Sequence, residues 1–221
     1  MTAEIMTFEK WVKGIFDRPE GPEPWYYDIN NQMPSIAPGL SVKYLRKLFT
    51  ESKDLLGKYS NLQLKWGLWY IIDCGNSSEL VSLLDKAIPL SEKLETIDSI
   101  FLLYKNCFFE RCANSLSQTN EAEENPLNVL CYMWWDVAPL PATAGKIDNR
   151  EIDAACLEVM QKVLLLENDA CRQSALHGLG HAKLYYPAEV EKIVDAFISA
   201  NPAMPKDLLL YAQSAREGTV Q

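Results

Sequence analysis

Apolar residues recur with the period of an α-helix along most of the chain. The clearest stripe falls at positions i, i+3, i+4, i+7 and i+8 and consists of Leu80, Leu83, Leu84, Ala87 and Ile88. Such spacing places the apolar side chains on one face of an amphipathic helix. Residues 94–108, 152–166 and 190–198 carry similar stripes, whereas the alternation typical of a strand is not sustained in any stretch. The sequence therefore predicts an all-α fold.

Two proline-rich segments interrupt the helical pattern. They cover residues 18–40 and residues 136–147, and both lack a sustained apolar stripe. The length of the chain suits one domain, so we predict a single helical domain over residues 1–221. Within it, the second break separates two lobes, at residues 1–135 and 148–221.

Charge and hydropathy exclude two classes of partner. With 30 acidic and 21 basic residues, the chain has a formal net charge of −9, and nucleic-acid phosphates repel such a surface. We therefore expect a protein partner and no nucleic acid. No stretch approaches the about 20 apolar residues of a membrane span, and the N-terminus lacks the apolar core of a signal peptide. These features predict a cytoplasmic protein with no membrane partner.

The cysteines are scattered along the sequence and form no CxxC pair. This spacing disfavours a zinc site built from thiolates. In a reducing compartment such residues act as small buried hydrophobes. We expect this of all six, which are Cys74, Cys107, Cys112, Cys131, Cys156 and Cys171.

The C-terminal third is similar to a HEAT-type repeat. Its sequence IDAACLEVMQKVLLLENDACRQSALHGLGHAKLYYPAEVEKIVDAFISA reads as a helix, a short turn at residues 167–169, a helix rich in small residues and a helix started by proline. The resemblance covers residues 148–216 and implies an irregular α-solenoid in which helical hairpins stack on one another. The earlier helices share no repeat length, and the usual Asp and Arg ladder positions are not evident.

The whole chain also resembles a group of uncharacterised bacterial proteins. The blocks QLKWGLWYIID, NPLNVLCYMWWDVAPL and CRQSALHGLGHAKLYYP carry this resemblance. It implies a bacterial setting and a helical fold, and it supplies no mechanism. By analogy with small acidic helical proteins that accompany secreted toxins, a toxin-immunity role is one specific expectation.

Both histidines of the chain lie in one short motif, His177-Gly-Leu-Gly-His181. Four residues turn a helix by about 400°, so both imidazoles share one face. The zinc-protease pattern HExxH requires a glutamate as general base beside the first histidine, and Gly178 takes that place. Cys171 falls on the other side of the helix. We therefore expect no bound metal ion and no cofactor.

Close packing between helices gives a second explanation of this motif. Gly178 and Gly180 each cost about 1 kcal/mol in a helix relative to alanine, and the close approach of a neighbouring helix offsets that cost. We expect Gly180 to face the neighbour, because it shares a flank with the histidines. The alternative is a ligand site or an active site in which His177 and His181 act with a carboxylate such as Asp136.

Two aromatic clusters are further candidates for binding. Trp25, Tyr26 and Tyr27 lie in the first proline-rich segment, where binding residues often concentrate. Trp134 and Trp135 precede Asp136 at the expected end of a helix. Adjacent helical positions point about 100° apart, so we expect one of these two tryptophans in the core and the other at its edge. Core packing and partner binding are both compatible with each cluster.

Motifs for nucleotide binding and nucleophilic catalysis are absent from the sequence. There is no GxGxxG, no GxxxxGK[ST] and no nucleophile-elbow pattern around a serine. We therefore predict a non-enzymatic protein that binds another protein. The alternative is a small-ligand-binding protein or an enzyme that uses the histidine motif. A cleft that unites both histidines with a carboxylate favours the alternative, and a closed histidine pair favours the first hypothesis.

Overall fold

The computed structural model describes residues 6–117, 124–141 and 149–220. Over these ranges the chain is helical and contains no strand, which confirms the all-α fold. The longer helices are α1 (Phe8–Phe16), α2 (Pro38–Thr50), α4 (Asn61–Ile72), α5 (Leu90–Leu103), α8 (Pro126–Val137), α9 (Arg150–Val163), α10 (Asp169–Ala182), α11 (Pro187–Ala200) and α12 (Lys206–Glu217). Shorter helical segments are η1 (Trp25–Tyr27), η2 (Ile29–Asn31), α3 (Ser52–Leu56), η3 (Leu80–Leu84), η4 (Tyr104–Phe108) and α6 (Phe109–Arg111).

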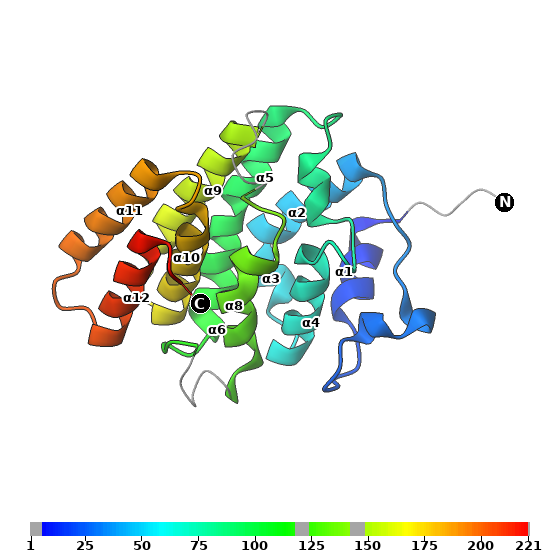
Figure 1. Ribbon diagram of the computed structural model, residues 1–221. Coiled ribbons are helices and arrows are strands. Elements are labelled where there is room, and N and C mark those ends of the chain that lie inside the picture. Colours follow the sequence, from blue (N-terminus) through cyan, green and yellow to red (C-terminus); the bar gives the residue numbers. More distant parts are fainter. Residues whose placement is uncertain (1–5, 118–123, 142–148, 221) are drawn as a thin grey trace.

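The helices pack in two adjoining rows, which Figure 1 shows side by side. In one row α4 contacts α8, α8 contacts α10, and α10 contacts α12. In the other row α2 contacts α5, and α5 contacts α9. Helix α1 lies against α4 at one end, and α11 packs against both α10 and α12 at the other. Helix α10 therefore has neighbours on several sides and lies inside the C-terminal half.

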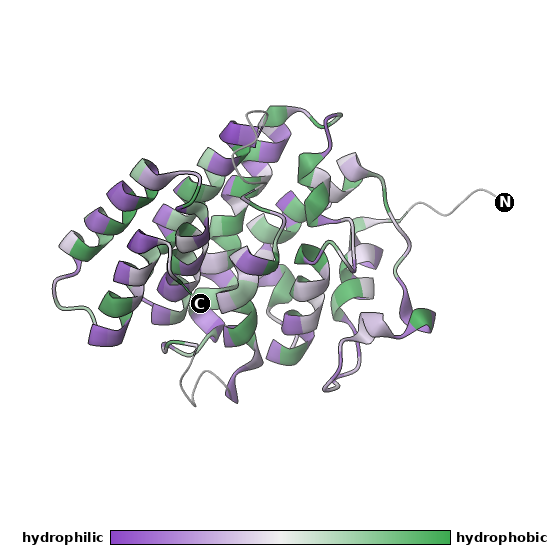
Figure 2. Cartoon of the chain, in the orientation of Figure 1, coloured by the Kyte–Doolittle hydropathy of each residue, from purple (hydrophilic) through white to green (hydrophobic). Residues whose placement is uncertain are grey.

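Apolar side chains fill the space between the two rows. The buried hydrophobic residues form a core cluster that runs from Phe8 in α1 to Ala215 in α12. Figure 2 shows the corresponding stripes, with hydrophobic and hydrophilic residues on opposite sides of α11. Helix α10 departs from this pattern, because most of its residues are buried. Within the described residues, no helix has the length and apolar composition needed to cross a membrane.

Residues 80–88, predicted as one amphipathic helix, form only the 3-10 helix η3 followed by a turn. Two features of the sequence end the helix early. Pro89 disfavours the helical conformation at Ile88. The Asp85 carboxylate accepts a hydrogen bond from the backbone N–H of Ala87 at 2.8 Å, a local turn that competes with the helix. An apolar stripe alone does not show where a helix stops.

The predicted break at residues 136–147 begins later than expected. Helix α8 continues to Val137, so Asp136 is helical. Leu140 then packs into the core cluster. Residues 142–147 lie outside the described ranges. Asp136 therefore occupies the last turn of α8, where its position is fixed by the packing of that helix.

Candidate functional site

A close approach of three helices positions the histidine motif. A methyl group on Gly178 would lie 2.8 Å from Cβ of Trp135 in α8 and 2.8 Å from Cε of Met160 in α9. A methyl group on Gly180 would meet the side chain of Val220, near the C-terminus, at 2.5 Å. The expectation that Gly180 faces the neighbouring helices was therefore wrong. Gly178 makes that contact, because it lies on the side of α10 that faces both α8 and α9.

This packing brings three polar side chains to one point. Nε2 of His181 lies 3.0 Å from Nε2 of His177 and 3.4 Å from Oδ1 of Asp136. The three candidate ligand atoms all lie within 4.8 Å of one another. The histidines come from successive turns of α10, and Asp136 comes from the last turn of α8. The structure thus joins the two histidines with the carboxylate named from the sequence.

Two tyrosines hold the ring of His177 in place. The hydroxyl of Tyr211 in α12 lies 2.7 Å from Nδ1 of His177. Tyr211 donates a hydrogen bond to the hydroxyl of Tyr132 at 3.4 Å, and the Tyr132 ring packs on His177 with its centroid 4.5 Å away. If Tyr211 donates to Tyr132 in this way, it accepts at the shorter contact, and His177 donates to it through Nδ1–H. In that tautomer Nε2 of His177 presents its lone pair to Nε2 of His181, 3.0 Å away.

Burial favours the neutral form of His177. Its pKa is lowered from 6.5 to about 4, first by burial and then by the neighbouring His181, while Asp136 acts in the opposite direction. His177 is therefore neutral at pH 7, which is the form that binds metal ions. Burial and the contact with Tyr132 also raise the pKa of Tyr211, so its hydroxyl keeps its proton. The site thus contains a fixed, neutral imidazole whose Nε2 lies 3.0 Å from Nε2 of His181.

A small cavity adjoins the three side chains. It has a volume of about 220 Å³ and is lined by Trp135, Asp136, Ala138, Leu140, Pro141, His181, Ala182, Tyr185 and Tyr186. The side chains of His181 and Asp136 are 47% and 41% exposed, whereas His177 is only 4% exposed. The cluster therefore has a buried side, at His177, and an open side toward the cavity.

The geometry fits two arrangements of protons and ligands. A hydrogen bond from Nε2–H of His181 to Nε2 of His177 satisfies the pair without any ion. In a metal site, bonds of about 2.0–2.1 Å place neighbouring ligand atoms about 2.8–3.0 Å apart in octahedral geometry and about 3.3–3.4 Å apart in tetrahedral geometry. The separation of 3.0 Å between the two histidines matches the first spacing, and the 3.4 Å between His181 and Asp136 matches the second. Two histidines and one carboxylate also form a ligand set common in catalytic metal sites.

The aromatic candidates separate into buried and exposed residues. Trp25 and Tyr26 are buried and pack on the ring of Tyr70, whereas Tyr27 is 70% exposed. Both Trp134 and Trp135 are buried, although we expected one of them at the edge of the core. The close contact of α8 with both α4 and α10 covers the two sides of this helix. Trp135 also lines the cavity beside Asp136.

Sequence reasoning missed Tyr211, Tyr132 and the cavity. Tyr211 follows His177 by 34 residues and Tyr132 precedes it by 45, and neither belongs to a recognisable motif. Asp136 was named as a candidate only because it follows two tryptophans. The contacts of α10 with α8 and α12 bring all three residues to His177. Such packing between helices leaves no short-range signal in the sequence.

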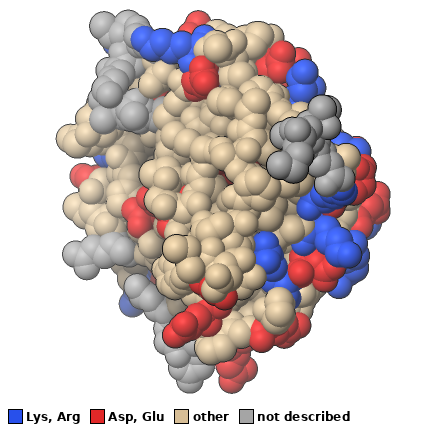
Figure 3. Space-filling view, turned by 90° about the vertical axis from the view of Figure 1, so that its right-hand side faces the viewer, with Lys and Arg blue, Asp and Glu red and all other residues tan. Residues whose placement is uncertain are grey.

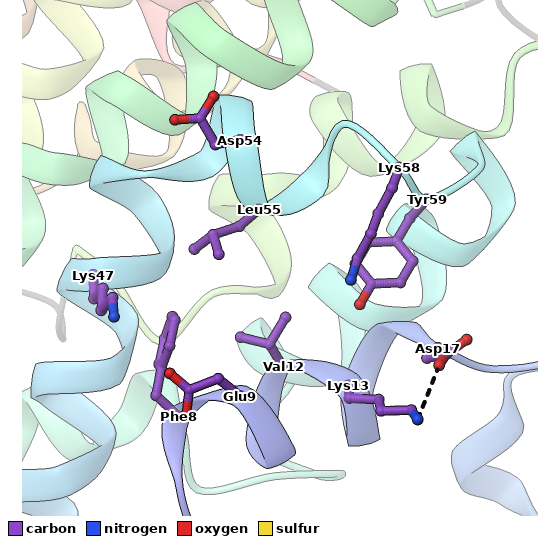
Figure 4. A pocket seen from close by; sticks show the side chains of 10 residues that line it. All are labelled: Phe8, Glu9, Val12, Lys13, Asp17, Lys47, Asp54, Leu55, Lys58 and Tyr59. Atoms are coloured by element: carbon purple, nitrogen blue, oxygen red, sulfur yellow. Dashed lines mark ion pairs between the residues drawn. The ribbon is translucent and has the colours of Figure 1, made fainter.

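A second cavity, of about 460 Å³, lies between α1, α2 and α3. Figure 4 shows its lining, in which lysines and carboxylates surround the apolar side chains of Phe8, Val12 and Leu55. Lys13 pairs with Asp17 at 3.8 Å. The charges of both signs offset each other across this groove. It therefore has no net charge that selects a ligand, and it contains no histidine.

Comparisons with known proteins add no further assignment. No model of a protein family matches the chain, and neither a curated protein nor a solved structure matches it. The resemblance to a group of uncharacterised bacterial proteins therefore stays a prediction. Any functional conclusion rests on the site itself.

Proposed function

We propose that the protein binds a divalent transition-metal ion through Asp136, His177 and His181, and that the bound ion serves a small-molecule site in the adjoining cavity. The observation that supports this proposal is the convergence of two imidazole nitrogens and one carboxylate oxygen within 4.8 Å. This is the alternative function predicted from the sequence, extended by a metal ion. Sequence reasoning disfavoured a metal because no third ligand adjoins the histidine motif, and the packing of α8 on α10 supplies one.

The surroundings of the three ligands support this assignment. The hydrogen bond between Nδ1 of His177 and the Tyr211 hydroxyl orients the ring, as outer partners do in known metal sites. Zinc, with three protein ligands, keeps a fourth position for water or substrate. His181 and Asp136 both line the cavity, so an open position would face it. Such an open position characterises catalytic metal sites rather than structural ones, and we propose an enzyme or ligand-binding role on this basis.

Titration with zinc, followed by calorimetry, tests the proposal. We expect one ion per chain, no binding to a His177→Ala, His181→Ala double variant, and at least a tenfold weaker affinity for Asp136→Asn. Loss of a group that hydrogen-bonds to a metal ligand typically lowers metal affinity by 10- to 100-fold, and loss of a ligand itself should lower it at least as much. Cys74→Ser is the matched control, because Cys74 is the exposed thiol among the described residues and could bind zinc by itself. Equal binding by wild type and the double variant would refute the site.

A protein-binding role, predicted from the sequence, is the second candidate. Figure 3 shows a face whose centre is largely free of charged side chains, on the side of the molecule that carries α1. Tyr27 and Ile29, in the first proline-rich segment, are 70% and 82% exposed. Tyrosine is one of the residues enriched in interface hot spots, and the exposed isoleucine two positions away adds apolar surface. We propose that a partner, such as a toxin countered by this chain, would bind there.

Cross-linking in the native host tests this second candidate. A specific partner should be lost in a Tyr27→Ser, Ile29→Ser double variant and retained in Leu165→Ser, which alters another exposed apolar residue. Equal recovery from both variants would rule out this surface. The metal titration and the cross-linking address different ends of the molecule, so each result stands independently.

We also propose that the two rows of helices represent an irregular, HEAT-like stack of helical hairpins. The succession of contacts α4–α8–α10–α12 in one row and α2–α5–α9 in the other supports this interpretation. A cytoplasmic location is proposed as well. It is supported by the buried thiols, such as Cys107, whose pKa burial raises to about 12 and which therefore stays a protonated, apolar residue.

A further inference from the structure

The charge balance at the cluster indicates which ligands the cavity would accept. Among the described residues that line it, Asp136 is the one with a carboxylate, and no lysine or arginine is present. A metal-bound histidine is neutral. A divalent ion held by two histidines and Asp136 therefore leaves a net charge of +1 next to a lining without basic residues. Such a site favours a single negative charge on its ligand.

The lining of the cavity adds constraints on size and polarity. Its volume of about 220 Å³ is below the about 300–1,000 Å³ of pockets for drug-sized ligands. Leu140, Pro141 and Ala182 contribute apolar surface, and the aromatic residues Trp135 and Tyr185 also line the space. Flat apolar groups pack favourably on such rings. The cavity thus suits a ligand with a short, apolar and preferably aromatic body.

Tyrosine hydroxyls do not change this charge balance. The hydroxyl of Tyr186 donates a hydrogen bond to the buried Asp153. Burial, and next this hydrogen bond, raise the pKa of Tyr186 to about 12. Its proton is therefore engaged with a carboxylate inside the protein. Tyr185 is exposed and stands at the edge of the cavity. Tyr185 and Tyr186 both line the cavity, and Tyr185 is 45% exposed.

We propose that the cavity binds a small monocarboxylate with an apolar body, whose carboxylate oxygen takes the open position of the metal ion held by Asp136, His177 and His181. This inference rests on the proposed metal site. The carboxylate would neutralise the remaining positive charge, and the body would lie against Trp135 and Tyr185. No bond of the ligand is broken or formed apart from its coordination to the metal.

Cobalt-loaded protein provides the test, because the visible absorption of Co²⁺ changes with its ligands. Benzoate should change the spectrum in a saturable way. Benzamide, its neutral analogue, should bind at least tenfold more weakly, because it carries no charge. Acetate should bind at least fivefold more weakly than benzoate, because it lacks the apolar body. Tyr185→Ala should weaken benzoate binding about fivefold and leave cobalt affinity unchanged, whereas Tyr27→Ala, a remote exposed tyrosine, should alter neither.

The possible results separate the two proposals. If cobalt binds through the three ligands and benzoate leaves the spectrum unchanged, the ligand assignment is wrong and the metal site stands. Equal affinities for benzoate and benzamide would likewise refute selection by charge. If cobalt does not bind to the wild type, or binds equally to the His177→Ala, His181→Ala variant, both proposals fail.

Discussion

Two polar clusters, one in each half of the molecule, place a carboxylate among hydrogen-bonding partners. In the N-terminal half, Glu79 is 4% exposed and accepts hydrogen bonds from Nε1 of Trp11 at 3.0 Å and from the Ser41 hydroxyl at 2.6 Å. In the C-terminal half, Asp136 lies on the open side of the histidine pair, beside a cavity. Both clusters join residues from distant parts of the sequence. They differ in whether their polar atoms are enclosed by hydrogen-bond partners from the protein or are open to a ligand.

The difference separates a structural role from a functional one. Each oxygen of Glu79 has a donor from the protein, and burial raises the pKa of its carboxyl group. A group enclosed in this way stabilises the fold and offers nothing to a ligand. Asp136 and His181 are almost half exposed and aim their polar atoms at each other. Changes at Glu79 should therefore act on stability, and changes at Asp136 and His181 on binding.

The largest effect on stability is expected from Glu79→Ala. The substitution leaves the Trp11 N–H and the Ser41 hydroxyl without their acceptor in the core. Each unsatisfied buried donor costs about 1–3 kcal/mol, so we expect a loss of about 3 kcal/mol in the free energy of unfolding. Urea denaturation measures this loss, and zinc affinity should be unchanged. A loss below about 1 kcal/mol, or a change in zinc affinity, would remove the contrast between the clusters.

Gly178→Ala should come next, with a loss of about 2 kcal/mol. Overpacking against Trp135 and Met160 costs about 1–3 kcal/mol, which exceeds the gain in helix propensity of up to about 1 kcal/mol. Gly180→Ala is the matched control. Its new methyl group meets the side chain of Val220, which follows α12 outside any helix and can shift more easily than α8 or α9. Chemical denaturation of both variants decides the point, and a larger loss for Gly180→Ala would contradict the packing described for α10.

A smaller effect of about 1–2 kcal/mol is expected from pH through His177. The unfolded histidine titrates near pH 6.5, and the folded one has a pKa of about 4. Between these values the unfolded state binds more protons, so the free energy of unfolding falls as the pH is lowered from 6.5 to 4. Above pH 6.5 this contribution is constant. Water at the open side of the cluster screens the interaction, so the effect stays below the value that the full difference in pKa would give.

Denaturation of metal-free protein at several pH values measures this effect. A His177→Gln variant should lose less stability than the wild type over the same range. Parallel profiles for the two proteins would mean that His177 is not held in its neutral form. The comparison between wild type and variant cancels what the other titratable groups contribute to the pH dependence of the free energy of unfolding.

The smallest change in stability is expected from Asp136→Asn, at under about 0.5 kcal/mol. The side chain is 41% exposed, and substitutions at such surface positions usually have little effect on folding. The same variant should lose zinc affinity by at least tenfold. Thermal unfolding without metal gives the first value, and calorimetry gives the second. A destabilisation comparable to that of Glu79→Ala would show that Asp136 has a structural role.

The sequence predicts the helices far better than it predicts their contacts. The helical stripes correctly indicated an all-α fold, because amphipathic periodicity follows from burial of one helix face. The stripe at residues 80–88 misled us, because Pro89 and the Asp85 turn limit the helix to Leu80–Leu84. Glu79 carried no signal, since its partners lie 38 and 68 residues away.

The site was predictable only in part, for a similar reason. The i, i+4 spacing of His177 and His181 fixes their common face from local geometry. The contribution of Asp136 depends on how α8 crosses α10. The sequence led us to expect Gly180 at that contact, whereas Gly178 makes it. Tyr211 reaches His177 from α12. Local geometry can be derived from a sequence, whereas the register between distant helices requires the fold.

Nuclear magnetic resonance of protein labelled with ¹⁵N in histidine tests the metal site most directly. The chain has only two histidines, His177 and His181, so both imidazoles can be followed without interference. Without metal at pH 7, we predict that His177 carries its proton on Nδ1. Addition of zinc should shift the Nε2 resonances of both rings together and reach completion at one equivalent per chain. If neither Nε2 resonance responds to zinc, the cluster is a hydrogen-bonded pair and the proposed metal site is wrong.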